Sequence, residues 1–136
     1  FSNKEQNKII GVDIKEIKPV PNIIMIKKDI FDFNFIPFIK KYTDGLDLII
    51  SDAAKSTTGN KLQDQLSSLE LCNKVFEISE NVLKKGGSII LKIFQSKEMD
   101  ALNFEIKKNF LIFNLYKPKS SNKDSKEIYI IGKFFK

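Results

Sequence analysis

LDLIISDAA, residues 46–54, indicates the fold of this chain more clearly than any other segment. A short apolar run ends in a carboxylate, Asp52, and a loop of small and polar residues follows it. This order is typical of a strand buried on both faces of a parallel sheet, which delivers an acid to the edge where open α/β sheets bind ligands. We therefore expect residues 46–51 to form a central strand and Asp52 to be a site residue. The alternative is that Asp52 only caps the loop that follows.

Two further apolar runs carry a charged residue. Lys92 stands among apolar neighbours in SIILKIFQ, residues 88–95, and Glu127 opens EIYIIG, residues 127–132. A charge within a strand is costly unless it is paired or has a function, so both residues are candidates for a catalytic site. The alternatives are that Lys92 reaches solvent at the strand end and that Glu127 forms a weak surface pair with Lys126 or Lys123.

Two more acids follow short apolar segments. Asp13 ends KIIGVD, residues 8–13, and Asp29 comes soon after NIIMIK, residues 22–27. An acid at the end of a strand can accept both hydroxyl groups of a ribose, so Asp13 is a candidate for nucleotide binding. Asp29 could accept from the amino group of an adenine. Both acids could equally well be caps at strand ends, without a ligand.

Strand-length and helix-length segments alternate along the chain. We expect strands at 8–13, 22–27, 46–51, 88–94, 111–116 and 126–134, and helices at 33–42, 61–85 and 97–108. Gly86 and Gly87 should end the long helix. Helices between strands predict a mostly parallel sheet with helices on both faces. The last two strands, with no helix between them, should form an antiparallel hairpin at one edge.

The predicted fold is therefore a Rossmann-like α/β sheet in a single domain, residues 1–136, which is incomplete at its N-terminus. A sheet of this kind normally opens with a strand and a Gly-rich turn that approaches a cofactor. The segment 8–13 already ends in the acid expected on the second strand, and no such turn precedes it. We expect the first strand and its turn to lie upstream of residue 1.

Composition limits the chemistry and suggests a partner. The chain has 23 basic residues, all lysines, a formal net charge of +6, no His and a single Cys, Cys72. These counts exclude histidine catalysis, a disulfide within the chain and cysteine-cluster zinc, so proton transfer must use Lys, Asp, Glu or Tyr and we expect no metal. The charge suits a polyanionic partner such as a nucleic acid, but by itself it is more often the mark of an ordinary basic protein. The absence of a long apolar run or a signal peptide predicts no membrane association and a cytoplasmic location.

Three motifs, in this order and spacing, resemble one known family. They are SDAAKSTTG at 51–59, GGSIILKIFQ at 86–95 and KPKSSNKDSKEIYIIG at 117–132. Together they are similar to the FtsJ-type RNA ribose 2′-O-methyltransferases, over residues 8–133. The most similar branch is the bacterial and organellar type, which methylates a uridine of large-subunit ribosomal RNA.

The resemblance implies a Rossmann-like fold that uses S-adenosylmethionine and a Lys-Asp-Lys-Glu tetrad. The last three tetrad members would be Asp52, Lys92 and Glu127. Lys92 would remove the proton of the ribose 2′-hydroxyl while the two acids orient the ammonium and the hydroxyl, and S-adenosylhomocysteine would be the product. The cofactor residues would be Asp13 at the ribose, Asp29 at the adenine and Asp52 near the methionine part.

The resemblance also implies an RNA partner, either large-subunit ribosomal RNA or the ribosomal subunit. Phosphate contacts would come from the polar segment around residues 117–126, through Lys117, Lys119, Lys123 and Lys126. We expect a monomer, in the cytoplasm or, if a targeting segment precedes Phe1, in a mitochondrion or plastid.

The sequence departs from the family pattern at several positions. The first Lys of the tetrad is expected upstream of residue 1, Lys55 stands in place of a Pro, and Ser96 stands in place of a Gly. Asn122 and Lys126 stand in place of arginines. Three alternatives stay open: a catalytically silent RNA-binding module with the same fold, a 2′-O-methyltransferase acting on transfer RNA or the messenger cap, and a nicotinamide-dependent oxidoreductase.

Overall fold

The structure, a computed structural model, describes residues 8–52, 59–119 and 126–136, and its elements follow the predicted order. In chain order the elements are β1 (Ile9–Asp13), β2 (Ile23–Lys27), α1 (Phe35–Ile39), β3 (Leu46–Ser51), α2 (Lys61–Val82), β4 (Leu83–Phe94), the short 3₁₀ turn η1 (Lys97–Met99), α3 (Asp100–Asn109), β5 (Phe110–Tyr116) and β6 (Glu127–Phe135). β3 has the bounds predicted for the central strand, but it lies at the edge of its sheet among the described strands. Leu48 and Ile50 are 48% and 62% exposed, so the expectation that this strand is buried on both faces is wrong. None of the described helices is long and apolar enough to cross a membrane.

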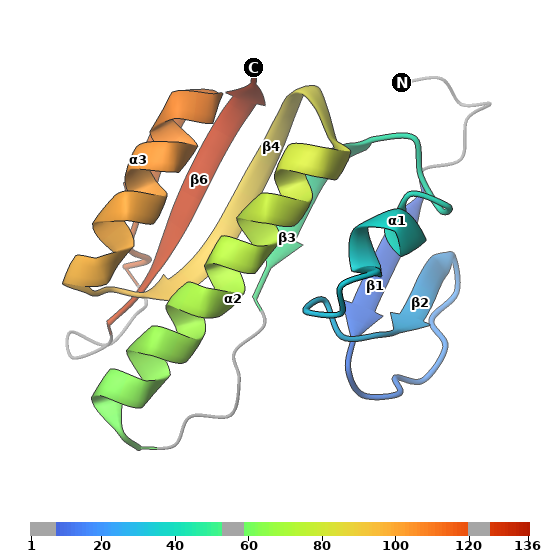
Figure 1. Ribbon diagram of the computed structural model, residues 1–136, viewed down its shortest axis with the longest axis horizontal. Coiled ribbons are helices and arrows are strands. Elements are labelled where there is room, and N and C mark those ends of the chain that lie inside the picture. The colour runs from blue at the N-terminus through green and yellow to red at the C-terminus, as the bar shows by residue number, and fades with distance from the viewer. Residues whose placement is uncertain (1–7, 53–58, 120–125) are drawn as a thin grey trace.

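The described strands form two sheets. β1 and β2 pair in parallel, and a second sheet has the order β3-β4-β6-β5. β3 and β4 are parallel, whereas β6 is antiparallel to both β4 and β5. The mixed α/β fold with a C-terminal antiparallel hairpin is therefore confirmed. Figure 1 shows β1, β2, β3 and β4 running in the same general direction, so that their carboxyl ends share one edge.

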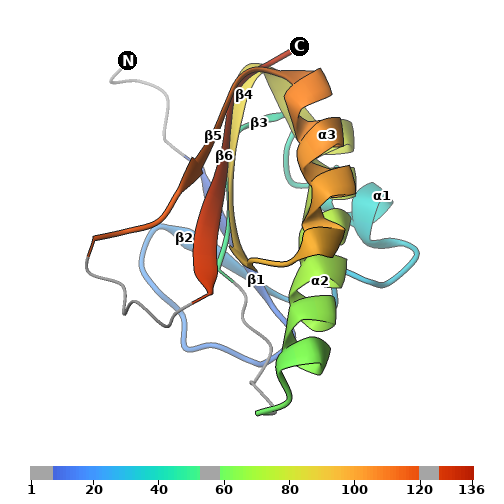
Figure 2. The same cartoon turned by 90° about the vertical axis from the view of Figure 1, so that its left-hand side faces the viewer.

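All three α-helices lie on one side of the strands (Figure 2). The expectation of helices on both faces is therefore wrong for the described part of the chain. The helical connections from β2 to β3 and from β3 to β4 advance in the same direction across the sheets (Figure 1), and the connection through α3 continues past β6 to the edge strand β5. Right-handed crossovers that advance in one direction place their helices on one face. The connection from β1 to β2 runs the other way and contains no helix. The opposite face of the four-stranded sheet, called the helix-free face below, is thus left without a helical layer among the described residues.

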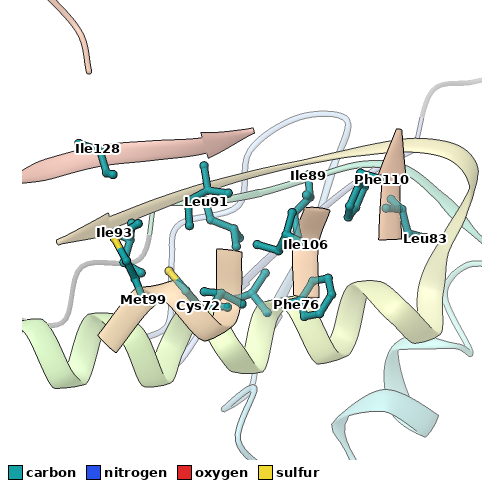
Figure 3. Packing of buried hydrophobic residues seen from close by; sticks show 13 residues of the cluster. Cys72, Phe76, Leu83, Ile89, Leu91, Ile93, Met99, Ile106, Phe110 and Ile128 are labelled. Carbon is teal, nitrogen blue, oxygen red and sulfur yellow. The ribbon is translucent and has the colours of Figure 1, made fainter. Parts of the chain in front are cut away.

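The main core lies between the helices and the four-stranded sheet. Figure 3 shows Cys72 and Phe76 of α2 beneath the side chains of β4, with Met99 and Ile106 beside them. Burial alternates along β4, because successive strand residues point to opposite faces. Ile89, Leu91 and Ile93 are at most 1% exposed and face the helices. The residues between them, Lys92 included, are half-buried and point to the helix-free face.

Two details of the long helix differ from the prediction. α2 ends at Val82, and Leu83 already pairs with Leu46 of β3. Gly86, with a φ of 84°, lies inside β4, where the register with β3 shifts. The glycine pair therefore forms an irregularity in a strand and does not end a helix.

The first turns of α2 are also less buried than their apolar spacing suggested. Leu62 and Leu66 are 60% and 45% exposed. Figure 1 shows the reason, since α2 extends past the end of the sheet and its first turns have no strand beneath them. The predicted apolar face is buried farther along the helix, at Val75, Phe76 and Val82.

Candidate functional site

Three charged side chains meet at the carboxyl ends of β3 and β4. Lys92 Nζ lies 2.7 Å from Glu127 Oε2 and 3.1 Å from Asp52 Oδ1. Asp52 directly follows β3, Lys92 points from β4 to the helix-free face, and Glu127 begins β6, which is antiparallel to β4. The fold thus brings together three residues that are far apart in the sequence. The side-chain carboxylate of Asp52 forms an ion pair with Lys92.

The cluster is accessible to solvent, and its negative charges outnumber its positive charge. The side chains of Lys92, Glu127 and Asp52 are 27%, 38% and 63% exposed, so a substrate can reach each of them. Hydrogen bonds to Glu127 and then to Asp52 raise the pKa of Lys92 above its ordinary range, and they outweigh the opposing effect of burial. Two carboxylates and one ammonium leave a net negative charge, which suits a cationic ligand.

Hydrogen bonds from α2 hold the end of β4 that carries Lys92. β3 pairs with β4 only as far as Ser51 and Leu91. Beyond that point, Cys72 Sγ donates to Lys92 O at 3.3 Å, and Ser68 Oγ accepts from Phe94 N at 3.0 Å. Gln65 Nε2 donates to Gln95 O at 3.0 Å.

This set of polar contacts was missed at the sequence level. Residues 65, 68 and 72 have the spacing of one helix face, and three polar or weakly polar side chains on the buried face of an amphipathic helix were the available signal. On the other side of β4, Gln95 N donates to Lys126 O at 2.7 Å and ties the strand end to the start of β6. The backbone around Lys92 is therefore supported from two directions.

Asp13 and Asp29 lie at the ends of the neighbouring strands β1 and β2. Asp13 Oδ1 accepts from Lys15 N at 3.0 Å, and Asp29 Oδ1 accepts from Phe31 N at 2.9 Å. These are the local turns that a strand-end cap makes. Each turn uses one carboxylate oxygen, and the second oxygen has the chemistry to accept from a ligand. The two acids belong to the β1-β2 sheet and lie apart from the ion-pair cluster along the chain.

The predicted phosphate-binding lysines flank the last hairpin. Lys117 and Lys119 follow β5, and Lys126 directly precedes Glu127. Lys123 lies outside the described residues, as do Lys55 and Asn122.

Asp64 occupies the first turn of α2, where the helix dipole stabilises an acid. The N-cap of α2 is Asn60, whose side chain accepts from Gln63 N. In the described ranges no cluster of His, Cys, Asp or Glu could hold a metal ion.

Comparison with known proteins gives a consistent result. The family model described as FtsJ-like methyltransferase matches residues 1–135. A curated relative named Ribosomal RNA large subunit methyltransferase E, from Rickettsia akari, is 38% identical over 131 residues, which are 96% of this chain and 58% of the relative. The chain therefore spans little more than half the length of this curated relative.

Solved structures agree with the family match. The crystal structure of a provisionally named ribosomal RNA methyltransferase from Plasmodium falciparum superposes with a TM-score of 0.82 at 33% identity, over 95% of this chain and 72% of that one. An rRNA methylase from Streptococcus thermophilus has a TM-score of 0.56 at 15% identity, over 95% of this chain and 74% of the other. The second likeness concerns the fold alone.

Proposed function

Because this chain belongs to the FtsJ-like methyltransferase family, we propose that the protein transfers a methyl group from S-adenosylmethionine to a ribose 2′-hydroxyl of RNA. One observation carries the proposal: Lys92 Nζ is held by both Glu127 and Asp52 at the ligand-binding edge of the sheet. A hydroxyl group bound at this cluster would lie within hydrogen-bond reach of a possible base, as general-base catalysis requires. A nicotinamide-dependent reaction does not account for the cluster.

The described residues fit the cofactor by their chemistry. Asp13, Asp29 and Asp52 each stand at or just beyond the end of a strand that runs toward the same edge (Figure 1). In the proposal Asp13 accepts from the ribose hydroxyls, Asp29 from the adenine amino group, and Asp52 lies near the methionine part. S-Adenosylmethionine supplies an electrophilic methyl group carried on a sulfonium cation. The net negative cluster around Lys92 is complementary to that charge.

Lys92 is the proposed proton acceptor. Its free amine would take the proton of the 2′-hydroxyl and become an ammonium, while Glu127 and Asp52 fix the positions of both groups. The hydroxyl oxygen would bond to the methyl carbon as the carbon–sulfur bond breaks, and S-adenosylhomocysteine would leave. The two carboxylates also raise the pKa of Lys92 and so favour its ammonium form. A cation near the cluster opposes this effect, because like charges disfavour protonation. The sulfonium of S-adenosylmethionine would have the required sign.

The proposed substrate is large-subunit ribosomal RNA, at a uridine, free or within the ribosomal subunit. The names of the curated relatives support the large subunit, and the net charge of +6 supports a polyanion. Lys117, Lys119, Lys123 and Lys126 are the proposed phosphate contacts. We propose a monomer in the cytoplasm, with the mitochondrion or plastid as the alternative compartment.

The proposal is tested by two measurements on the full-length protein. The first is calorimetric titration with S-adenosylmethionine, and the second is transfer of a labelled methyl group to large ribosomal subunits. We expect cofactor binding and incorporation of the labelled methyl group into the RNA. The RNA should resist alkaline cleavage next to the labelled ribose, since a 2′-O-methyl group blocks that cleavage. RNA binding without cofactor binding would replace the proposal with a catalytically silent RNA-binding module.

A further inference from the structure

A row of three side chains crosses the helix-free face of the four-stranded sheet and begins at Lys92. Lys92 of β4 is paired with Tyr129 of β6, and Tyr129 is paired with Tyr116 of β5. Directly opposed residues of antiparallel strands project to the same face, and adjacent strands lie about 4.8 Å apart. Tyr116 therefore stands two strands from Lys92, on the order of 10 Å away at the backbone.

Burial confirms which face the row occupies. Ile128 and Ile130, on either side of Tyr129 in the sequence, are 5% and 0% exposed and belong to the core under the helices. Tyr129 alternates with them, so it points to the face of Lys92. Tyr116 is 51% exposed on the edge strand. The row is thus continuous with the ion-pair cluster and accessible to a ligand.

The rings and hydroxyl groups of both tyrosines are without a specific partner in the described part of the chain. Within the described ranges, neither ring contacts another aromatic ring and neither hydroxyl has a hydrogen-bond partner, whereas Tyr42 packs against Phe38 with ring centroids 5.4 Å apart. Basic residues adjoin the row, because Lys117 follows Tyr116 and Lys126 lies at the start of β6. Aromatic rings next to lysines are the means by which proteins bind single-stranded nucleic acid, with bases stacked on the rings.

We propose that Tyr116 and Tyr129 form a base-stacking shelf, which binds an unpaired nucleobase of the RNA beside the ribose presented to Lys92. This inference rests on the proposed function, since the 2′-hydroxyl at Lys92 sets the path of the RNA strand. An RNA strand fits the surface better than a protein segment does, because a protein segment laid over the two rings would also cover the charged cluster next to them. Stacking tolerates any base, so the shelf contributes affinity and position more than sequence choice.

The experiment measures RNA binding by variants of the full-length protein. The probe is fluorescently labelled single-stranded oligouridylate, and the readout is anisotropy at several salt concentrations. Tyr116→Ala should weaken binding by about 5- to 30-fold, the lower part of the range found when a stacking ring is truncated. The slope of log Kd against log salt should not change, because a neutral ring releases no counterions. Tyr116→Phe should bind within about twofold of the parent, since stacking uses the ring and not the hydroxyl.

The matched control is Leu115→Ala, on the same strand. Leu115 is 49% exposed, and its partner in β6 is Ile130, so it belongs to the opposite face. Equal affinities of Tyr116→Ala and Leu115→Ala, with the parent binding RNA, would overturn the shelf and leave the proposed function standing. A parent protein that neither binds RNA nor transfers methyl groups would instead overturn the proposed function. If Tyr116→Ala fails to fold, a large loss of affinity in the folded Tyr116→Phe variant would exclude stacking.

Discussion

At the scale of single residues, the charge on Lys92 decides whether the site can accept a proton. The side chain is held by two carboxylates at 2.7 and 3.1 Å, so its position is well defined. If Lys92 is the base, Lys92→Ala should lower the methylation rate of the full-length protein by about 100-fold or more, the usual contribution of a general base. Initial rates on large ribosomal subunits measure this.

Lys84→Ala is the control for Lys92→Ala. Lys84 also forms an ion pair, 3.7 Å from Asp47, but its side chain is 56% exposed and lies at the other end of β4. This variant should methylate at the parental rate. A Lys92→Ala protein that retains more than a tenth of the parental rate would remove Lys92 from the role of base.

A second prediction concerns the pKa of Lys92. The hydrogen bond to Glu127 is the largest cause that raises this pKa, so Glu127→Gln should bring it back toward the ordinary value of 10.5. Nitrogen-15 NMR of the lysine side chains, followed over pH, reads the pKa directly. Asp47→Asn, at the exposed pair with Lys84, should leave the resonance of Lys92 unchanged.

The sign of the accompanying stability change follows from linkage. A Lys whose pKa is raised on folding stabilises the folded state fully below its unfolded pKa, near 10.5, and this contribution is lost as pH rises through the higher folded pKa. The difference in unfolding free energy between parent and Glu127→Gln should therefore be constant at neutral pH and should shrink above about pH 10.5. A difference that grows with pH in that range would contradict the assignment.

At the scale of elements, the contact between α2 and the end of β4 is a testable unit. Ser68→Ala removes the oxygen that accepts from Phe94 N and leaves a partly buried N–H without this partner. We expect the free energy of unfolding to fall by about 1 kcal/mol, measured by urea denaturation. Ser67→Ala is the control, because it makes the same change of helix propensity one residue away. The Ser67 hydroxyl accepts from Gln63 on the exposed surface, so this variant should leave the free energy of unfolding nearly unchanged. Equal effects of the two variants would show that the contact with β4 adds nothing.

The elements also show what local sequence could and could not predict. The run from Leu46 to Ser51 is apolar except at Asp47 and has a polar end, and its bounds were predicted correctly. Helix α2 was predicted to reach Lys85, but a strand pairing between Leu83 and Leu46 ends it at Val82, and pairing between segments far apart in the sequence is not visible in a local pattern. Leu62 and Leu66 have helical spacing, yet they stay exposed because burial depends on how far the sheet extends.

The candidate site likewise has residues that local sequence predicts and residues whose placement depends on strand pairing. Asp52, Lys92 and Glu127 could be found because each is a charge at or within an apolar strand, and the fold brings them within ion-pair distance. The row from Lys92 through Tyr129 to Tyr116 could not be found, because it depends on the register of three strands, and a slip of one residue would turn each side chain to the other face.

At the scale of the whole molecule, the one-sided helical layer leaves apolar groups on the helix-free face. Leu48 and Ile50 of β3 are 48% and 62% exposed, and Ile112 of β5 is 40% exposed. Exposed apolar patches of this kind bind apolar ligands from water. We expect the 136-residue chain to bind anilinonaphthalene sulfonate while folded, with fluorescence that falls when Ile50 is changed to Ser.

The control for this last prediction separates the helix-free face from exposed apolar groups in general. Phe104 is also 62% exposed, but it lies on α3, in the helical layer. Phe104→Ser should keep the parental dye fluorescence, since a single exposed ring on a helix is common and makes no patch. If both variants lose fluorescence equally, the dye reports scattered apolar side chains, and the four-stranded sheet presents no continuous apolar surface. If Ile50→Ser alone loses it, the surface next to Lys92 is apolar enough to bind the aromatic face of a ligand, as the shelf of Tyr116 and Tyr129 requires.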